Sequence, residues 1–196
     1  MQVLAKQLAA VSHAIAKNDV RYYLEGVHFS RVEKDLRVVG DDTTKIQATN
    51  GHILLELVTD QPYFDVDAPS DYIIQFTTDQ LRDIRKKANA DKPVSFFGLD
   101  DPLTSKMELG GTVSMVQVLD GKFPDTAKVW PKETNGALKD GMGFNADYIA
   151  TMSKAGKSAE PYADVTAMRF VFADNMAAIV EYPGLDLKGL IMPMRA

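Results

Sequence analysis

The sequence predicts an α+β fold made of repeated units, each with one helix and a small antiparallel sheet. Three short segments have apolar residues at helical spacing, and each precedes β-rich segments separated by polar turns. The order of one helix and three strands recurs three times at roughly regular spacing without sequence identity, which is typical of repeated architecture. We therefore expect three helix-plus-sheet units per chain.

The first unit begins with a helix predicted over residues 1–17. Its buried stripe has spacings of four, three and four and consists of Leu4, Leu8, Val11 and Ile15. Met1–Val3 is too short to supply a strand before this helix, so the unit is expected to lack a leading strand. Alternating or β-rich segments predict strands over 20–29, 36–40 and 45–57. Residues 61–70, with two prolines and two acids, are expected to form a surface connection.

The second and third units follow the same order with a leading strand. Helices are predicted over 78–87 and 145–157, with Thr78 and Asn145 as their N-caps. Leu81, Ile84 and Ala88 are expected to face the core. Strands are predicted over 72–76, 94–97, 105–109, 113–119, 142–144, 165–172, 177–182 and 187–192, with Gly110–Gly111 as a hairpin turn.

Domain boundaries follow from composition. Residues 131–141 contain enough Gly, Pro and charge to form a linker. We therefore expect a lobe of two repeat units over 1–130 and a half-domain over 142–196.

Bulk composition limits the class of protein. The chain has 196 residues and no cysteine, so it has neither a disulfide framework nor a thiolate metal site. It contains no apolar run of the ~20 residues that a membrane helix needs, and its amino terminus does not resemble a signal peptide. We expect a cytoplasmic protein, in a bacterial cell or an infected host, with no membrane partner.

Charge is unevenly distributed along the chain. The net charge is −5, but the three predicted helices carry eight cations and three acids, which leaves −10 for the rest. Basic helices on a negative body are what a protein that surrounds a polyanion requires. Solvated helix lysines with no such role are the alternative on charge alone.

No catalytic constellation is present in the sequence. His13, His28 and His52 lie in no nucleophile or metal-ligand motif, and the acidic pairs are typical of polar loops. Gly110–Gly111 precedes no helix and no Gly-Lys-Ser/Thr sequence, so it is not a phosphate-binding loop. We expect no catalysis, no metal and no cofactor.

Five segments resemble the bacterial DNA polymerase III β subunit, the sliding clamp, in the order found in that family. They are VRYYLEG (20–26), ATNGHIL (48–54), LDGKFPD (119–125), GFNADY (143–148) and IMPMR (191–195). The resemblance implies a DNA-clamp fold with helices on the inner face of a ring and sheets outside. It covers a middle domain joined to the second half of a last domain, and the family's first domain has no counterpart here.

The resemblance implies a DNA sliding clamp that holds a replicative polymerase on duplex DNA. The family's ring has twelve helix-plus-sheet units, so three per chain imply a homotetramer, with a clamp loader as a further partner. The DNA-facing residues are expected to make nonspecific backbone contacts and are Lys6, Lys17, Arg82, Arg85, Lys86, Lys154 and Lys157.

The resemblance also implies a pocket for partner peptides between the middle domain and the carboxyl-terminal tail. We expect the apolar tail to pack on earlier segments. The expected pocket residues are Leu24, Thr49, Gly51, His52, Leu54, Pro124, Val129, Leu190, Met192, Pro193 and Met194. The alternative is that the tail is simply the last core strand.

Several residues depart from the family's pattern near this pocket. The departures are Asn50 for Asp, Ile53 for Arg, Thr126 and Ala127 for Tyr and Arg, and Ala196 for Leu. They favour a virus-encoded or mobile-element-encoded form with its own partner set. Two other functions stay open: a clamp-like decoy that sequesters clamp-binding peptides without encircling DNA, and a structural module without a functional pocket.

Overall fold

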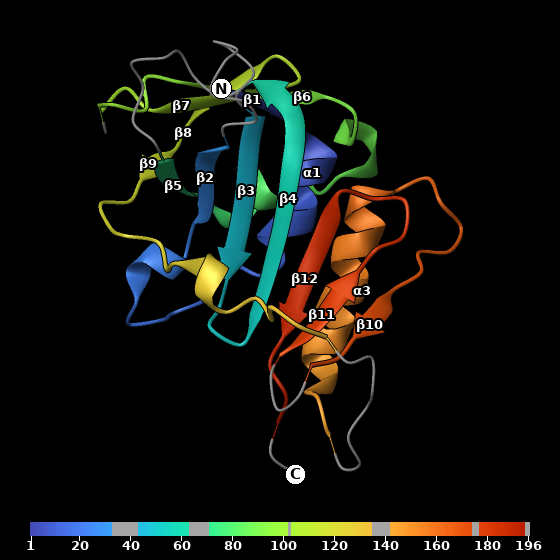
Figure 1. Ribbon diagram of the computed structural model, residues 1–196. Coiled ribbons are helices and arrows are strands. Elements are labelled where there is room, and N and C mark those ends of the chain that lie inside the picture. The colour runs from blue at the N-terminus through green and yellow to red at the C-terminus, as the bar shows by residue number, and fades with distance from the viewer. Residues whose placement is uncertain (33–42, 63–70, 102, 135–141, 174–176, 195–196) are drawn as a thin grey trace, which may run out of the picture.

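The computed structural model describes residues 1–32, 43–62, 71–101, 103–134, 142–173 and 177–194, which form helices packed on antiparallel sheets (Figure 1). The α-helices in these ranges are α1 (Ala5–Ser12), α2 (Thr78–Ile84) and α3 (Ala146–Ala159). Short 3₁₀ turns are η1 (Tyr22–Leu24), η2 (Lys87–Asn89) and η3 (Thr126–Lys128). None of these helices is long and apolar enough to span a membrane.

Two antiparallel sheets contain the strands of the described ranges. The four-stranded sheet has the order β1 (Gln2–Leu4), β6 (Pro93–Phe97), β7 (Lys106–Leu109), β8 (Thr112–Met115). The eight-stranded sheet has the order β10 (Arg169–Val171), β11 (Ala178–Glu181), β12 (Leu187–Ile191), β4 (Ile53–Pro62), β3 (Thr43–Thr49), β2 (Val27–Val32), β5 (Asp71–Gln75), β9 (Gln117–Val118).

The last strand of the chain lies inside the larger sheet. β12 pairs with β11 on one side and with β4 on the other, from Leu187↔Leu57 to Ile191↔Ile53. Strands from the beginning and the end of the chain therefore share one set of ladder hydrogen bonds, and Figure 1 shows them side by side. The division into lobes 1–130 and 142–196 stays a prediction, and 135–141 of the expected linker lies outside the described residues.

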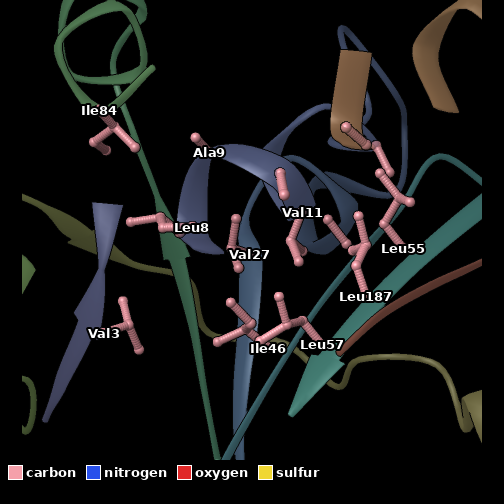
Figure 2. Close-up of a cluster of buried hydrophobic side chains, with 14 of the residues drawn as sticks. Val3, Leu8, Ala9, Val11, Val27, Ile46, Leu55, Leu57, Ile84 and Leu187 are labelled. Atoms are coloured by element: carbon pink, nitrogen blue, oxygen red, sulfur yellow. The ribbon is translucent and has the colours of Figure 1, made fainter. Parts of the chain in front are cut away.

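One hydrophobic core lies between the helices and the sheets. Side chains from both sheets and all three helices meet in a single cluster, part of which is drawn in Figure 2. The labelled residues come from β1, α1, β2, β3, β4, α2 and β12 and are Val3, Leu8, Ala9, Val11, Val27, Ile46, Leu55, Leu57, Ile84 and Leu187. The helices therefore lie together on one side of the larger sheet.

The expected α+β clamp fold is confirmed, but several boundaries differ. β1 pairs with β6 through Gln2↔Ser95 and Leu4↔Pro93, so the expectation that the first unit lacks a leading strand is wrong. Because Gln2–Leu4 are paired with β6, α1 begins only at Ala5. The N-cap of α2 is Thr77 rather than Thr78: its side chain accepts from the Gln80 backbone in a capping box.

Other differences occur at element ends. α2 ends at Ile84, so Ala88 lies in η2 and is exposed rather than buried. The predicted strand over 20–29 is η1 followed by β2, and 142–144 contributes only the bridge Gly143↔Met194. Asn145 caps α3 as predicted, and Gly110–Gly111 turns the β7–β8 hairpin with positive φ at both glycines. The strand predicted over 36–40 lies outside the described residues.

Leu187 joins the carboxyl-terminal strand to the core, and its replacement tests that packing. Leu187 is 2% exposed in the cluster of Figure 2. Because the surrounding side chains cannot close the cavity, we expect Leu187→Ala to lower the free energy of unfolding by about 2–5 kcal/mol in urea denaturation. The control Val165→Ala removes carbon atoms from a side chain that is 82% exposed and should change the stability by less than about 0.5 kcal/mol. Equal effects of the two variants would contradict this packing.

Candidate peptide pocket and basic helix face

A small cavity lies on the face of the eight-stranded sheet opposite the helices. Its floor spans three neighbouring strands, where Thr49 of β3 pairs with Leu54 of β4 and Leu54 pairs with Leu190 of β12. The cavity has a volume of about 160 Å³. Leu54 and Leu190 are each 2% exposed and pack with Trp130 in a cluster separate from the main core. The cavity therefore exists only because β12 pairs with β4.

One wall of the cavity is a segment that crosses this face of the sheet. We call residues 119–134 the crossing segment; it is yellow in Figure 1 and passes in front of β3 and β4. The Tyr22 hydroxyl donates to the Asp120 carbonyl oxygen near its start. A Cβ on Gly121 would lie 2.8 Å from the Tyr23 Cβ, so the close approach requires glycine here. This contact explains the glycine of the LDGKFPD motif.

The second wall is the tight turn between β3 and β4. Gly51 has φ +87°, in the left-handed region that glycine adopts without strain. The Asn50 Oδ1 accepts from the backbone N–H groups of His52 at 2.9 Å and Ile53 at 3.0 Å. An aspartate carboxylate would accept the same two bonds. The departure from Asp to Asn at residue 50 therefore leaves this wall of the cavity intact.

An ion pair lies at the edge of the cavity beside this turn. The Arg21 guanidinium donates to both Asp19 carboxylate oxygens, at 3.0 and 2.8 Å. These hydrogen bonds lower the pKa of Asp19 to about 2. His52 stacks on Tyr148 of α3, with ring centroids 5.5 Å apart. The cavity thus has an apolar floor and a polar edge whose one arginine is already paired.

The structure brings nine of the eleven expected pocket residues together. Those lining the cavity are Leu24, Thr49, Gly51, His52, Leu54, Pro124, Val129, Leu190 and Met192. Pro193 and Met194 do not line it, and Met194 is 53% exposed. Further lining residues, missed from the sequence, are Arg21, Ile53, Asp125 and Thr126. All four lie inside or next to the sequence motifs that resemble the clamp family. Including every motif residue and its immediate neighbours in the expected pocket would therefore have found them.

A basic surface lies on the helix side of the molecule. An open hollow of about 890 Å³ at the carboxyl end of α1 is lined by residues of α1, α2 and α3, and five of the expected DNA-facing cations lie there: Lys17, Arg82, Arg85, Lys86 and Lys154. An adjoining hollow shares Arg85 and Lys86 and contains the other two, Lys6 and Lys157, together with Lys87. All seven predicted cations therefore lie on one continuous side.

The three helices are held together by polar contacts within this surface. The Arg85 side chain donates to the Ser12 hydroxyl at 3.0 Å and the Ser12 carbonyl at 2.9 Å, which ties α2 to α1. His13 Nε2 lies 2.9 Å from the Ser158 hydroxyl of α3. Burial and then the positive charges of Arg85 and Lys154 lower the pKa of His13 to about 4. The imidazole is therefore neutral near pH 7 and leaves the surface charge to the lysines and arginines.

The cations differ in how they are paired. Lys6, Arg82 and Lys86 form ion pairs with Asp91, Asp79 and Asp83, respectively. Within the part of the chain that the structure describes, Lys17, Lys154 and Lys157 make no ion pair. In the same part, no three His, Asp or Glu side chains are grouped to hold a metal ion. The chemistry that this arrangement supports is contact with an anionic surface.

A basic helix face backed by antiparallel sheets defines the DNA-clamp fold class, and solved structures with that fold are similar to this chain. The DNA polymerase sliding clamp of Pseudomonas aeruginosa matches with a TM-score of 0.70 and 20% identity, over 100% of this chain and 66% of that one. The Bacillus subtilis clamp matches with a TM-score of 0.69 and 15% identity, over 100% of this chain and 64% of that one. The Bartonella birtlesii clamp, solved bound to griselimycin, matches with a TM-score of 0.69 and 18% identity, over 100% of this chain and 66% of that one.

Sequence similarity leads to the same family. The β sliding clamps of two Caulobacter vibrioides strains are 28% identical over 145 residues, which span 71% of this chain and 36% of theirs. No family model matches the sequence. The resemblance to the bacterial DNA polymerase III β subunit is confirmed in sequence and fold, and this chain covers less than two thirds of the length of the clamps that it matches.

Two glycine variants test how the β3–β4 turn supports the cavity edge. A Cβ on Gly51 would lie 2.9 Å from Arg21 Nη2, whereas one on Gly111, with φ +84°, would meet nothing within 4 Å. Alanine in the left-handed region costs about 1–2 kcal/mol at either site, measured by urea denaturation. Only Gly51→Ala should also displace Arg21 and raise the pKa of Asp19 from about 2 toward its ordinary value, measured by NMR titration. An unchanged Asp19 pKa in Gly51→Ala would contradict the contact.

Proposed function

We propose that this chain is the subunit of a DNA sliding clamp, a processivity factor that encircles duplex DNA and tethers a polymerase. The observation that carries the proposal is the placement of two surfaces on opposite sides of one sheet. Seven cations lie on the helix side, and an apolar cavity lies on the other. One side can face the phosphates while the other stays accessible to proteins. The same proposal places the protein in the cytoplasm, where bacterial DNA is replicated.

The ring is proposed to be a homotetramer. Two exposed edge strands, β8 of the smaller sheet and β10 of the larger, lie at opposite ends of the molecule in Figure 1. On β8, Val113 is 60% exposed and Met115 is 49% exposed, so a neighbouring strand would cover apolar surface there. A head-to-tail contact between the two edges closes into a ring when its rotation allows. Native mass spectrometry should find four times the 21.6 kDa chain mass, and a monomer would contradict the ring.

The cations are proposed to contact the DNA backbone without reading bases. Lysine side chains that lack an ion pair can exchange between phosphates at low cost, which sliding requires. Retention is then topological, because a closed ring leaves circular duplex only when it opens. A clamp loader that opens the ring is part of this proposal.

The cavity is proposed to receive one apolar side chain of a partner peptide, from a polymerase or another replication protein. Its apolar floor excludes water, and Met192, which is 36% exposed at the edge, can adapt to different anchors. A cavity of about 160 Å³ is large enough for a single anchor, so the rest of a larger bound ligand would lie outside the cavity.

Replacement of three lysines of the basic surface tests the DNA interface. The triple variant Lys17→Ala, Lys154→Ala, Lys157→Ala should lose affinity for duplex DNA, and the slope of log affinity against log salt should become shallower by about 0.9 for each phosphate that the variant no longer neutralises. A matched control replaces the exposed Lys106, Lys122 and Lys132 outside the helix surface, and both variants change the net charge from −5 to −8. Equal effects of the two variants on affinity, measured by fluorescence anisotropy across a salt series, would contradict a DNA-facing helix side.

Met192→Ala tests the pocket with griselimycin as the probe, since griselimycin was solved bound to the clamps of Bartonella birtlesii and Pseudomonas aeruginosa. The shorter side chain should weaken binding about fivefold, or about 1 kcal/mol, in calorimetry, because it removes part of the cavity edge. Met194→Ala should have little effect, because Met194 does not line the cavity. Neither variant should change the oligomer mass. A larger effect at Met194 than at Met192 would contradict this assignment of the pocket.

A further inference from the structure

A row of four polar side chains crosses the same face of the sheet as the cavity. His28 of β2 pairs in register with Gln47 of β3, Gln47 with Glu56 of β4, and Glu56 with Lys188 of β12. His28, Gln47 and Glu56 are 8%, 1% and 6% exposed. Buried polar groups destabilise a fold unless they are hydrogen-bonded, so the contacts of this row need an explanation.

Gln47 and Glu56 form the centre of the row. The Gln47 Nε2 donates to Glu56 Oε2 at 2.5 Å and to the Thr126 hydroxyl at 2.7 Å. Because an ionised carboxylate only accepts, Glu56 fixes the orientation of the Gln47 amide. The other Glu56 oxygen lies 3.1 Å from the Lys188 Nζ, across the β4–β12 pairing. Glu56 thus contacts both the Gln47 amide, which donates to Thr126, and Lys188 of β12. β12 is the strand that contains Leu190 and precedes Met192.

Three residues of the crossing segment contact side chains of this row. Phe123 stacks on His28, with ring centroids 4.4 Å apart and planes at 8°. Thr126 accepts the Gln47 bond, and the Lys188 Nζ lies 4.9 Å from the centre of the Trp130 ring. The same segment supplies Pro124, Asp125, Thr126 and Val129 to the cavity wall, whereas none of the four row residues lines the cavity.

We propose that Gln47 and Glu56 are positioning residues of the partner pocket: together they hold the crossing segment and β12 at the separation that the cavity requires. This inference rests on the proposed function, because it concerns the partner affinity of the same pocket. A row that only satisfied buried polar groups would affect stability alone. A positioning row also affects where the crossing segment lies in the folded protein and how tightly the pocket binds.

The chain provides a direct reporter of the crossing segment, because Trp130 is its only tryptophan. Gln47→Met keeps the side-chain length and removes the amide, so acrylamide quenching of Trp130 should rise in the folded full-length protein. Griselimycin binding should weaken about tenfold, because the amide no longer holds the cavity wall. The matched control is Gln75→Met, which removes a 3.3 Å bond to Glu25 elsewhere in the same sheet and should change neither readout.

A second pair of variants separates the effect of losing the Thr126 hydroxyl from a general effect of replacing Thr126. Thr126→Val removes the group that accepts from Gln47, and Thr126→Ser retains it, so only the valine variant should raise Trp130 quenching. In a double-mutant cycle, Gln47→Met and Thr126→Val should be non-additive in quenching, because both remove the same hydrogen bond.

The outcomes distinguish this inference from the pocket proposal. Unchanged quenching in both Gln47→Met and Thr126→Val, or increased quenching without weaker griselimycin binding, would overturn the positioning role. A wild-type protein that does not bind griselimycin would contradict the pocket, while the quenching comparison would still support or overturn the placement of the crossing segment by Gln47.

Discussion

The pairing of β12 with β4 is the constraint on which the rest of the structure depends. Five residue pairs, from Leu187↔Leu57 to Ile191↔Ile53, attach the end of the chain to a strand formed more than a hundred residues earlier. This pairing completes the eight-stranded sheet and brings α3 beside α1. It also places Leu190 next to Leu54 to form the cavity floor. Without it, neither the basic face nor the pocket would be complete.

Close backbone approach on the helix side makes this arrangement possible. Gly189 of β12 faces α3, where a Cβ would lie 2.9 Å from the Met152 sulfur. The Tyr182 hydroxyl donates to the Met152 carbonyl at 2.8 Å, so the helix is fixed by a polar contact as well as by packing. Small side chains at the contact let α3 lie against the sheet, and its lysines then join the cations of α1 and α2 on one surface.

The sequence predicted the helices and most strands because their apolar periodicity is strong. It failed where tertiary pairing overrides local pattern: Gln2–Leu4 becomes a strand only because the edge of β6 is available to it. Of the candidate site, the motif residues were predictable by resemblance. Arg21 and Thr126 could have been included as neighbours of the motif residues, but the hydrogen bond from Gln47 to Thr126 was not predictable, because the two residues are distant in sequence. The polar row was unpredictable for the same reason, since register across four strands cannot be read from any one of them.

The alternation of side chains along a strand links the two faces of this molecule. On β4, Leu55 and Leu57 enter the main core, whereas Leu54 and Glu56 lie on the pocket side. A slip of one residue in the β4–β12 register would exchange these sets, placing a carboxylate in the core and breaking its contact with Lys188. The Glu56–Lys188 ion pair therefore stabilises the observed β4–β12 register, and its loss destabilises a register shifted by one residue. The same contact that specifies the pairing also holds the pocket, so correct folding and partner binding depend on one register.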